Sequence, residues 1–326
     1  MVLLKKEFNG FMLAALLGLL AYYTAPWLPS LFNSILVALI FGMIIGNSVK
    51  LPDSFQSGIT FTSGKLLELS ILFLAFSINY SHIAALGINS FIIVLVTIIV
   101  ILLITFYLAK KINCPGATGW LVGFGTAICG SSAIAALAPS VAKNKDDVGI
   151  AMAVVNLFGT IGMVLLPFVH IKFKLSAAET GLLVGGSLHS VGNVAGAGYG
   201  INNEIGEAAI TIKLARVAML SPALIFFNYL VNRHEAKNWK ERFSLPWYLW
   251  GFIVITIVAS LINIPETVTH AMDFAGKIAL TIAMAAIGLK VSFKNLYLSG
   301  RRGLGFGLII FTTQLILLAL LMLLLV

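Results

Sequence analysis

Apolar runs long enough to cross a lipid bilayer follow one another along almost the whole chain. Hydrophobic residues make up 60% of the 326 positions and charged residues only 10%, whereas a soluble domain is about 25% charged. The chain must therefore use lipid as its solvent, and without barrel-like alternation only a helix bundle satisfies its backbone. We predict one polytopic all-α membrane domain, residues 1–326, with about eleven transmembrane helices. The predicted spans are 10–25, 31–47, 64–80, 90–109, 117–141, 149–169, 179–199, 205–231, 247–263, 272–290 and 303–326.

The lysines and arginines predict the orientation of these spans. With a cytoplasmic N-terminus, 16 of them fall inside and only three, Lys143, Lys145 and Lys277, fall outside. Most of the net charge of +9 is then a topology signal, so we expect no nucleic-acid partner. The first apolar run could pass for a signal peptide, but Pro26 disfavours cleavage, and we interpret it as a retained span.

The predicted span at 117–141 is interrupted by helix-weakening residues. Its centre reads Gly-Thr-Ala-Ile-Cys-Gly-Ser-Ser, from Gly125 to Ser132, and an alanine-rich stretch follows. A half-helix that starts at Gly130 presents free N–H groups and the positive end of its dipole at membrane depth, which favours an anion. The alternative is that glycine and serine only allow close helix packing.

A second interruption lies within 181–204, where glycines alternate with Ser187, His189, Ser190 and Asn193. Ionisable residues inside a membrane are rare and usually line a pathway, so we favour a cavity-lining role for His189, which could carry a coupling proton. The alternative is a satisfied structural histidine.

Two cations lie within the next span. Lys213 and Arg216 are three residues apart and share a helix face, and Arg216 is about 12 Å along the helix. Candidate partners are Glu204, Glu207, Glu68 or a bound anion. Snorkelling of one cation and pairing of the other is the alternative to an electropositive cavity. Asn156 is a further possible polar contact.

An internal repeat links "GKLLELSILFL", from Gly64, with "GKIALTIAMAA", from Gly276. The predicted spans run the two copies in opposite directions, as in the inverted repeats of many secondary transporters. The same count gives both interrupted spans one direction, whereas an inverted repeat requires opposite directions. Either a span is miscounted or the repeat elements are permuted along the chain.

The stretches "TAICGSSAIAALAPSVAKNKDDVGIAMAVVNLFGTIGMVLLP" and "GGSLHSVGNVAGAGYG", followed by "TIKLARVAMLSPALI", resemble the sulfate exporter family of YeiH-like bacterial inner-membrane proteins. The resemblance covers nearly the whole chain. It implies export of sulfate or a related anion, and the inverted-repeat fold of sodium–proton antiporters and bile acid sodium symporters. In that fold two broken helices cross near the membrane centre. The sequence has Ser190 where the family pattern has aspartate, and Asn193 where glutamine is common; losing the carboxylate puts proton coupling in doubt and leaves a more positive field.

These features predict a secondary transporter of a small anion in the bacterial inner membrane, working by alternating access, with a proton or sodium as the candidate coupling ion. The alternative is a cation–proton antiporter or sodium-coupled organic anion symporter, which usually needs a mid-membrane carboxylate; none lies near the breaks. We expect no enzyme activity, cofactor or metal, because no P-loop, CxxC spacing or matched catalytic set is present. Oligomeric state stays open. The predicted substrate-binding residues are Thr126, Cys129, Gly130, Ser131, Ser132, Ser187, His189, Ser190, Asn193, Lys213 and Arg216.

Overall fold

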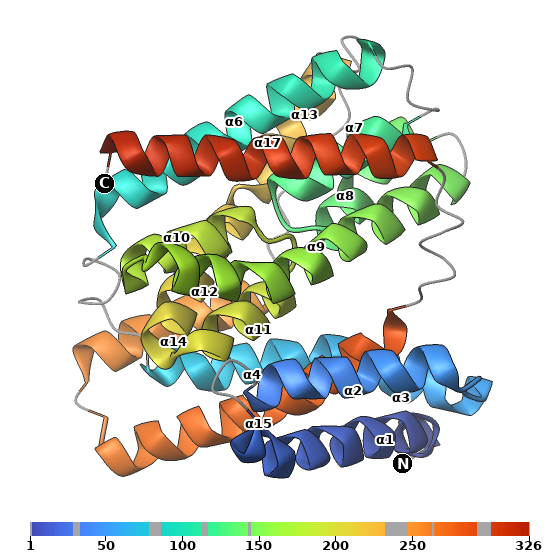
Figure 1. Cartoon of the computed structure of the whole chain (residues 1–326), viewed down its shortest axis with the longest axis vertical. Helices are drawn as coiled ribbons and strands as arrows, with labels where there is room; N and C mark the ends of the chain where they lie inside the picture. Colours follow the sequence, from blue (N-terminus) through green and yellow to red (C-terminus); the bar gives the residue numbers. More distant parts are fainter. Residues whose placement is uncertain are drawn as a thin grey trace. The chain divides into compact units, whose positions relative to one another are not determined.

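The computed structural model describes residues 2–28, 33–77, 86–111, 117–142, 145–231, 247–262, 264–291 and 301–325. These residues form helices without any strand, which confirms the predicted all-α class (Figure 1). The helices are α1 (Val2–Thr24), α2 (Ser34–Ser48), α3 (Asp53–Phe61), α4 (Leu67–Leu74), α6 (Gly87–Lys111), α7 (Thr118–Ala127), α8 (Ser131–Val141), α9 (Lys145–Phe173), α10 (Ala177–Ser187), α11 (Val191–Ile201), α12 (Asn203–Ala218), α13 (Leu220–Val231), α14 (Trp247–Leu261), α15 (Glu266–Lys290) and α17 (Arg301–Leu325). A π-turn, η2 (Thr62–Leu66), joins α3 to α4.

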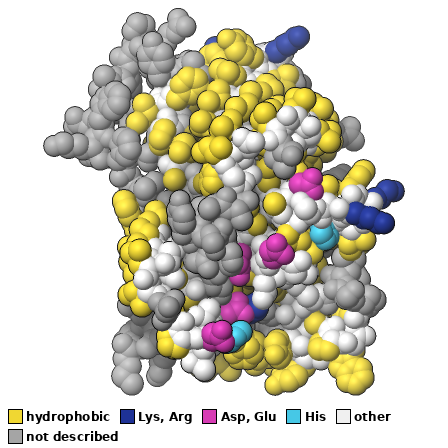
Figure 2. Space-filling view, turned by 90° about the vertical axis from the view of Figure 1, so that its left-hand side faces the viewer, with side chains coloured by type: hydrophobic (Ala, Val, Ile, Leu, Met, Phe, Trp, Pro, Cys, Tyr) yellow, Lys and Arg dark blue, Asp and Glu magenta, His cyan; other side chains and the backbone are white. Residues whose placement is uncertain are grey.

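The helices have the length and surface of an integral membrane protein. In the described part of the chain, six segments are long and apolar enough to cross a bilayer: 7–27, 53–74, 87–111, 147–173, 266–290 and 303–325. Their outward faces are apolar, as Leu323 (85% exposed) and Ile88 (72% exposed) illustrate. Figure 2 shows hydrophobic side chains over much of the visible surface. Helix is present in every predicted span, and the number of membrane crossings stays a prediction.

The chain divides into two compact units. The first comprises residues 1–84, 195–207 and 247–293, and the second comprises residues 85–194, 208–246 and 294–326. In the first unit α4 and α15 run antiparallel, because Gly276 lies against Leu74 whereas Lys290 Nζ is 3.4 Å from Ser63 Oγ. The two copies of the predicted repeat are therefore neighbours with opposite directions, as an inverted repeat requires.

Glycines bring helices of the first unit into backbone contact. A Cβ atom at Gly288 of α15 would overlap the carbonyl oxygen of Leu39 in α2, and one at Gly42 of α2 would overlap that of Ala285. Small residues allow this approach in membrane bundles, where packing replaces the hydrophobic effect as the force between helices. The α2–α15 pair is thus a close-packed element of the first unit.

We expect Gly288→Ala to lower the free energy of unfolding by about 1–3 kcal/mol, because the new methyl group must push α2 and α15 apart. Thermal unfolding of the purified protein in detergent measures this. Gly149→Ala in α9 is the matched control, since a Cβ there meets no atom within 4 Å. Alanine also favours helix over glycine, so the control should be unchanged or more stable. Equal losses in both variants would contradict the packing argument.

Three long helices frame the second unit. The ends of α6 and α17 are antiparallel, since Asn89 Nδ2 donates to Leu325 O at 2.7 Å. Helix α17 runs parallel to α9, with Gly303 against Ile150 and Gly307 against Val154. Because α9 has 29 residues, it is about 43 Å long and provides a scale along which the interrupted segments can be placed.

The first interrupted segment, α7–α8, is a helical hairpin. Asp147 at the beginning of α9 accepts a hydrogen bond of 2.6 Å from Thr118 Oγ1, at the beginning of α7. Helix α8 ends at Val141, four residues before Lys145, and such a link extends at most about 14 Å. The chain therefore returns to the level at which it entered. With 10 and 11 residues, each arm is about 15 Å long, roughly half the hydrocarbon thickness.

The second interrupted segment also turns back, from the opposite end of α9. Thr180 Oγ1, near the beginning of α10, lies 2.8 Å from His170 Nδ1, near the end of α9. After the break the chain leaves at Val191, and by Ala208 of α12 it packs against Gly181 of α10. In Figure 1, α7 and α8 accordingly lie toward the right-hand end of α9 and α10 toward its left-hand end.

The two hairpins correct the expectation that the broken helices cross. They begin at opposite ends of α9 and meet at their tips. The two interrupted segments therefore run in opposite directions, although the count of eleven spans gave them the same direction. Nine of the eleven predicted spans then remain as candidate crossings. When the two interrupted spans no longer cross, the predicted side of Lys143 and Lys145 becomes cytoplasmic and that of Lys172 and Lys174 becomes external. The predicted distribution of lysines and arginines therefore stays at 16 inside and three outside. The cytoplasmic N-terminus stays a prediction.

Candidate functional site

The hairpin tips meet at Gly130 and His189. Gly130 has φ +72° and ψ −129°, a conformation that side chains disfavour. Its N–H donates to Gly125 O at 2.9 Å, and a Cβ there would be 3.4 Å from the backbone of His189. His189 is 1% exposed, and its Nε2 is 3.2 Å from Thr126 Oγ1. The structure thus brings the two predicted breaks together.

Lys213 bonds to both tips. Its Nζ atom donates to Ile128 O at 2.5 Å and to Leu188 O at 2.8 Å. These carbonyls follow the last residues of α7 and α10, where intrahelical N–H partners have run out and the dipoles end negative. Since the side chain is fully buried, snorkelling is excluded. The ammonium group therefore caps the C-terminal ends of two half-helices at once.

Arg216 repeats this arrangement one turn further along α12, with 1% of its surface exposed. One guanidinium nitrogen donates to carbonyl groups of α10 and its break, and the other to carbonyl groups at the end of α7. The acceptors are Gly185 O (3.1 Å), Gly186 O (2.7 Å), Leu188 O (3.2 Å), Thr126 O (2.8 Å) and Ala127 O (2.9 Å). A planar fork suits two acceptor groups on opposite sides. Together the cations fasten one tip to the other.

The carboxylates considered as partners do not take this role within the second unit. None of its described Asp or Glu side chains forms an ion pair with Lys213 or Arg216. Glu68, Glu204 and Glu207 belong to the first unit. Backbone carbonyl groups are therefore the partners of both cations.

The N-terminal ends of the other two half-helices face the middle of α9. Ser131 Oγ, at the beginning of α8, donates to Asn156 Oδ1 at 3.0 Å. At the beginning of α11, the N–H of Asn193 donates to Ser190 Oγ at 3.0 Å. The Asn193 amide lies against Gly159, where a Cβ would overlap it. Gly159 is the midpoint of α9, so both positive helix ends lie at the same depth.

Polar groups at this depth are accessible. Ser132 and Asn156 are exposed, and Ser131, Ser190 and Thr160 are half-buried. At mid-length of a membrane-spanning helix, accessible hydroxyl and amide groups are tolerated where they line a cavity rather than face lipid. Sequence reasoning singled out the three serines and mentioned Asn156, but it missed Thr160. The signal for Thr160 was its place one turn after Asn156.

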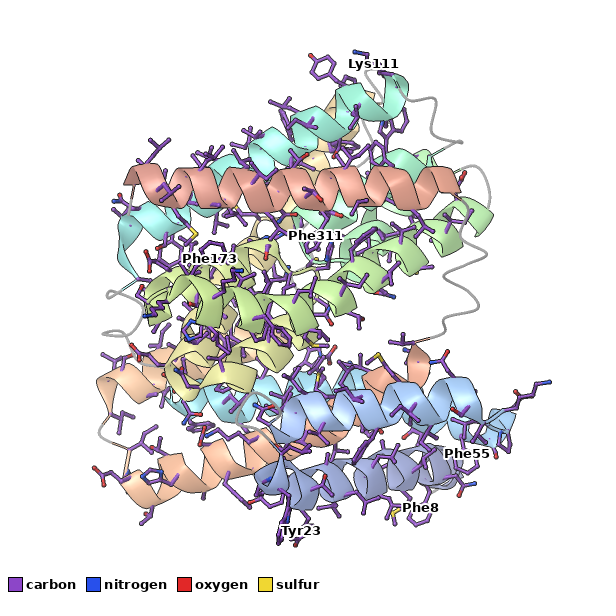
Figure 3. The ribbon with its side chains drawn as sticks, in the orientation of Figure 1. Phe8, Tyr23, Phe55, Lys111, Phe173 and Phe311 are labelled. Atoms are coloured by element: carbon purple, nitrogen blue, oxygen red, sulfur yellow. The ribbon has the colours of Figure 1, made fainter. Side chains whose placement is uncertain are left out.

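Helix α17 forms the back of the second tip, which the sequence did not reveal. Gln314 is fully buried, and its Nε2 donates to Gly186 O at 2.9 Å, beside Arg216. The Phe311 ring lies 5.1 Å from the His189 ring, centroid to centroid, and is labelled in Figure 3. A single amide side chain within the long apolar segment 303–325 was the available signal.

Two of the predicted binding residues are less accessible than Ser131, Ser132 and Ser190. Ser187 is buried, and its hydroxyl donates to Leu183 O of its own helix at 2.6 Å. Cys129 is 6% exposed, at the first tip. Neither lies on the accessible polar face of α9, so a direct role for them stays a prediction.

The chain is similar to membrane proteins along nearly its whole length. The family model described as "Conserved hypothetical protein 698" matches residues 9–307. A UPF0324 membrane protein of Helicobacter hepaticus is 29% identical over 93% of both chains. The UPF0324 inner membrane protein YeiH of Escherichia coli K12 is 31% identical over 86% of this chain and 82% of its own. Among solved structures, the sodium proton antiporter MjNhaP1 from Methanocaldococcus jannaschii is 16% identical, with a TM-score of 0.31 over 95% of this chain and 99% of that one.

Proposed function

This chain belongs to the conserved hypothetical protein 698 family of membrane proteins, and we propose that it is a secondary transporter of a small anion, with sulfate or a sulfonate as the substrate class. The substrate binds at the N-terminal ends of α8 and α11, and transport proceeds by alternating access around the hairpin tips. The observation that carries the proposal is the charge at these tips.

The paired tips hold a surplus of positive charge. Each helix end is equivalent to about half an elementary charge. The two C-terminal ends offset about one of the two charges on Lys213 and Arg216, and the two N-terminal ends add about one. No described carboxylate of the second unit pairs with these cations. The remaining surplus of about two charges would be balanced by a divalent oxyanion.

The donors for such an anion lie on the accessible side. Backbone N–H groups at a helix start bind oxyanions directly, and the hydroxyl groups of Ser131, Ser132 and Ser190 are beside them. Asn156 and Thr160 line the same depth of α9. Lys213 and Arg216 act through their field in this scheme, because the Lys213 ammonium and both terminal guanidinium nitrogens of Arg216 donate to carbonyl oxygens. A transported cation would instead meet an unfavourable potential here.

Flux of labelled sulfate in proteoliposomes tests the proposal. We expect the purified protein to exchange sulfate, and Ser131→Ala combined with Asn156→Ala to lower the rate about tenfold through loss of hydrogen bonds to the anion. Ser63→Ala, which removes a hydroxyl group from the first unit, is the control. Collapsing a proton or sodium gradient in turn identifies the coupling ion. Protein that moves sodium or protons without any anion dependence would establish the alternative function.

A further inference from the structure

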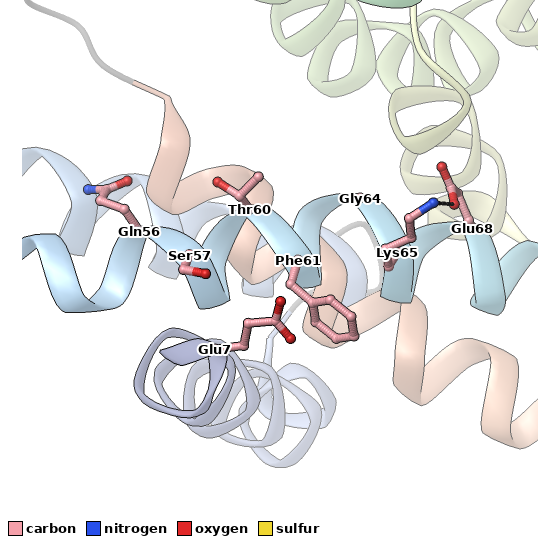
Figure 4. A pocket seen from close by; sticks show the side chains of 8 residues that line it. All are labelled: Glu7, Gln56, Ser57, Thr60, Phe61, Gly64, Lys65 and Glu68. Carbon is pink, nitrogen blue, oxygen red and sulfur yellow. Dashed lines mark hydrogen bonds and ion pairs between the residues drawn. The ribbon is translucent and has the colours of Figure 1, made fainter. Parts of the chain in front are cut away.

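A second polar site lies in the first unit, at the π-turn between α3 and α4. It is a pocket of about 550 Å³. Its lining comes from α1, α3, the turn and α4, and Figure 4 shows these side chains: Glu7, Gln56, Ser57, Thr60, Phe61, Gly64, Lys65 and Glu68. The π-turn gives the segment an irregular turn where a regular helix would continue, and such turns are frequent at functional sites. The transport scheme uses none of these residues.

Lys65 and Glu68 are paired at one side of the pocket. Lys65 Nζ is 3.0 Å from Glu68 Oε2, and the Trp247 indole N–H donates to the same oxygen at 2.6 Å. The Lys65 ammonium also lies 5.5 Å from the centroid of the Trp247 ring. These contacts neutralise Glu68. Glu7, on the facing helix, has no hydrogen bond or ion pair with any described side chain, so the described lining is acidic by one charge.

The pocket lies at the level of helix ends. Trp247 is the first residue of α14, and Lys290, the last residue of α15, approaches Ser63 within the π-turn. Half-exposed tryptophan and lysine at helix ends are typical of the membrane–water interface, where lipid headgroups lie. Two exposed apolar side chains lie here, Phe61 in the lining (38% exposed) and Leu69, which follows Glu68 (39% exposed).

We propose that this pocket binds the headgroup of a phospholipid that carries a primary ammonium group, as in phosphatidylethanolamine. The ammonium group donates to the Glu7 carboxylate and to the hydroxyl oxygens of Ser57 and Thr60. The phosphate accepts from Lys65, and the acyl chains follow Phe61 and Leu69. A quaternary ammonium has no N–H to donate, so a phosphatidylcholine with identical chains lacks the bonds that give the site its selectivity.

Native mass spectrometry of the full-length protein, with equal amounts of dioleoyl phosphatidylethanolamine and dioleoyl phosphatidylcholine, tests this assignment. We expect the wild-type protein to retain the ethanolamine lipid about tenfold more, the ratio that one charge-assisted hydrogen bond supplies. Glu7→Gln should bring the ratio close to one. Gly64→Leu should abolish retention by filling the pocket, and it should fold, because a Cβ at Gly64 meets no atom within 4 Å.

Gly149→Leu is the matched control, since it places the same side chain in open space on α9 and should bind as the wild type does. Equal retention of the two lipids by the wild type would overturn the proposal, as would undiminished selective retention by Gly64→Leu. Free ethanolamine is a third arm. If it displaces the lipid at equal concentration, the ligand is a soluble amine and the lipid assignment is wrong.

Discussion

Replacing Arg216 by methionine is expected to lower the free energy of unfolding by about 3–5 kcal/mol, the range observed when one member of a buried charged network is removed. The substitution keeps an unbranched apolar stem but removes the guanidinium group. Leu188 O keeps the Lys213 donor and Gly186 O keeps the Gln314 donor, whereas Thr126 O, Ala127 O and Gly185 O lose theirs. These oxygens are buried, and each one left without a donor costs about 1–3 kcal/mol. The hairpin tips should separate as a consequence.

Thermal unfolding in detergent, monitored by tryptophan fluorescence, measures the loss of stability. Arg216→Lys should recover part of it, because an ammonium group reaches one tip but cannot span both as the planar fork does. Lys213→Met should also be destabilising, since Lys213 donates to one carbonyl of each tip. Lys172→Met on the exposed end of α9 is the control and should unfold as the wild type does. If the loss for Arg216→Met equals that of this control, the cations are not structural caps.

The breaks themselves were predictable from sequence, whereas their geometry was not. Glycine and serine weaken a helix wherever they cluster, so Gly130 and the Gly185–Asn193 stretch indicated interruptions. Whether a chain continues or turns back after a break is decided by distant contacts. Here these are the Asp147–Thr118 bond for the first hairpin and the contact between His170 and Thr180 for the second. No local composition encodes them.

The partners of Lys213 and Arg216 were hidden for a related reason. A buried cation in a membrane indicates a functional or structural site, and sequence reasoning looks for its partner among side chains. The acceptors here are backbone carbonyls that become available only because two helices end at the same depth. These carbonyl groups lie where they do because both segments turn back as hairpins. The wrong expectation of crossing helices and the failure to predict the cations' partners therefore have one cause. Gln314 was missed likewise, since its acceptor is Gly186 O.

The second large effect is expected at Gly130. Its φ of +72° and ψ of −129° lie outside the regions open to residues with a side chain, so Gly130→Ala should cost about 1–3 kcal/mol in backbone strain. The space around it is not the cause, because a Cβ would meet only ordinary contacts, at 3.4 Å from His189. The strain is relieved if the chain rotates at the break. Such a rotation turns the Ser131 N–H and hydroxyl away from the beginning of α11.

Gly130→Ala should therefore lose sulfate flux in proteoliposomes as well as thermal stability. Gly305→Ala in α17 serves as the control, since its Cβ meets no atom within 4 Å and alanine favours the helix there. A variant that is destabilised yet transports normally at a temperature where it stays folded would show that the tip conformation supports the fold but not the anion site. A variant that keeps its stability would contradict the strained backbone, because no relaxed conformation places an L-alanine at these angles.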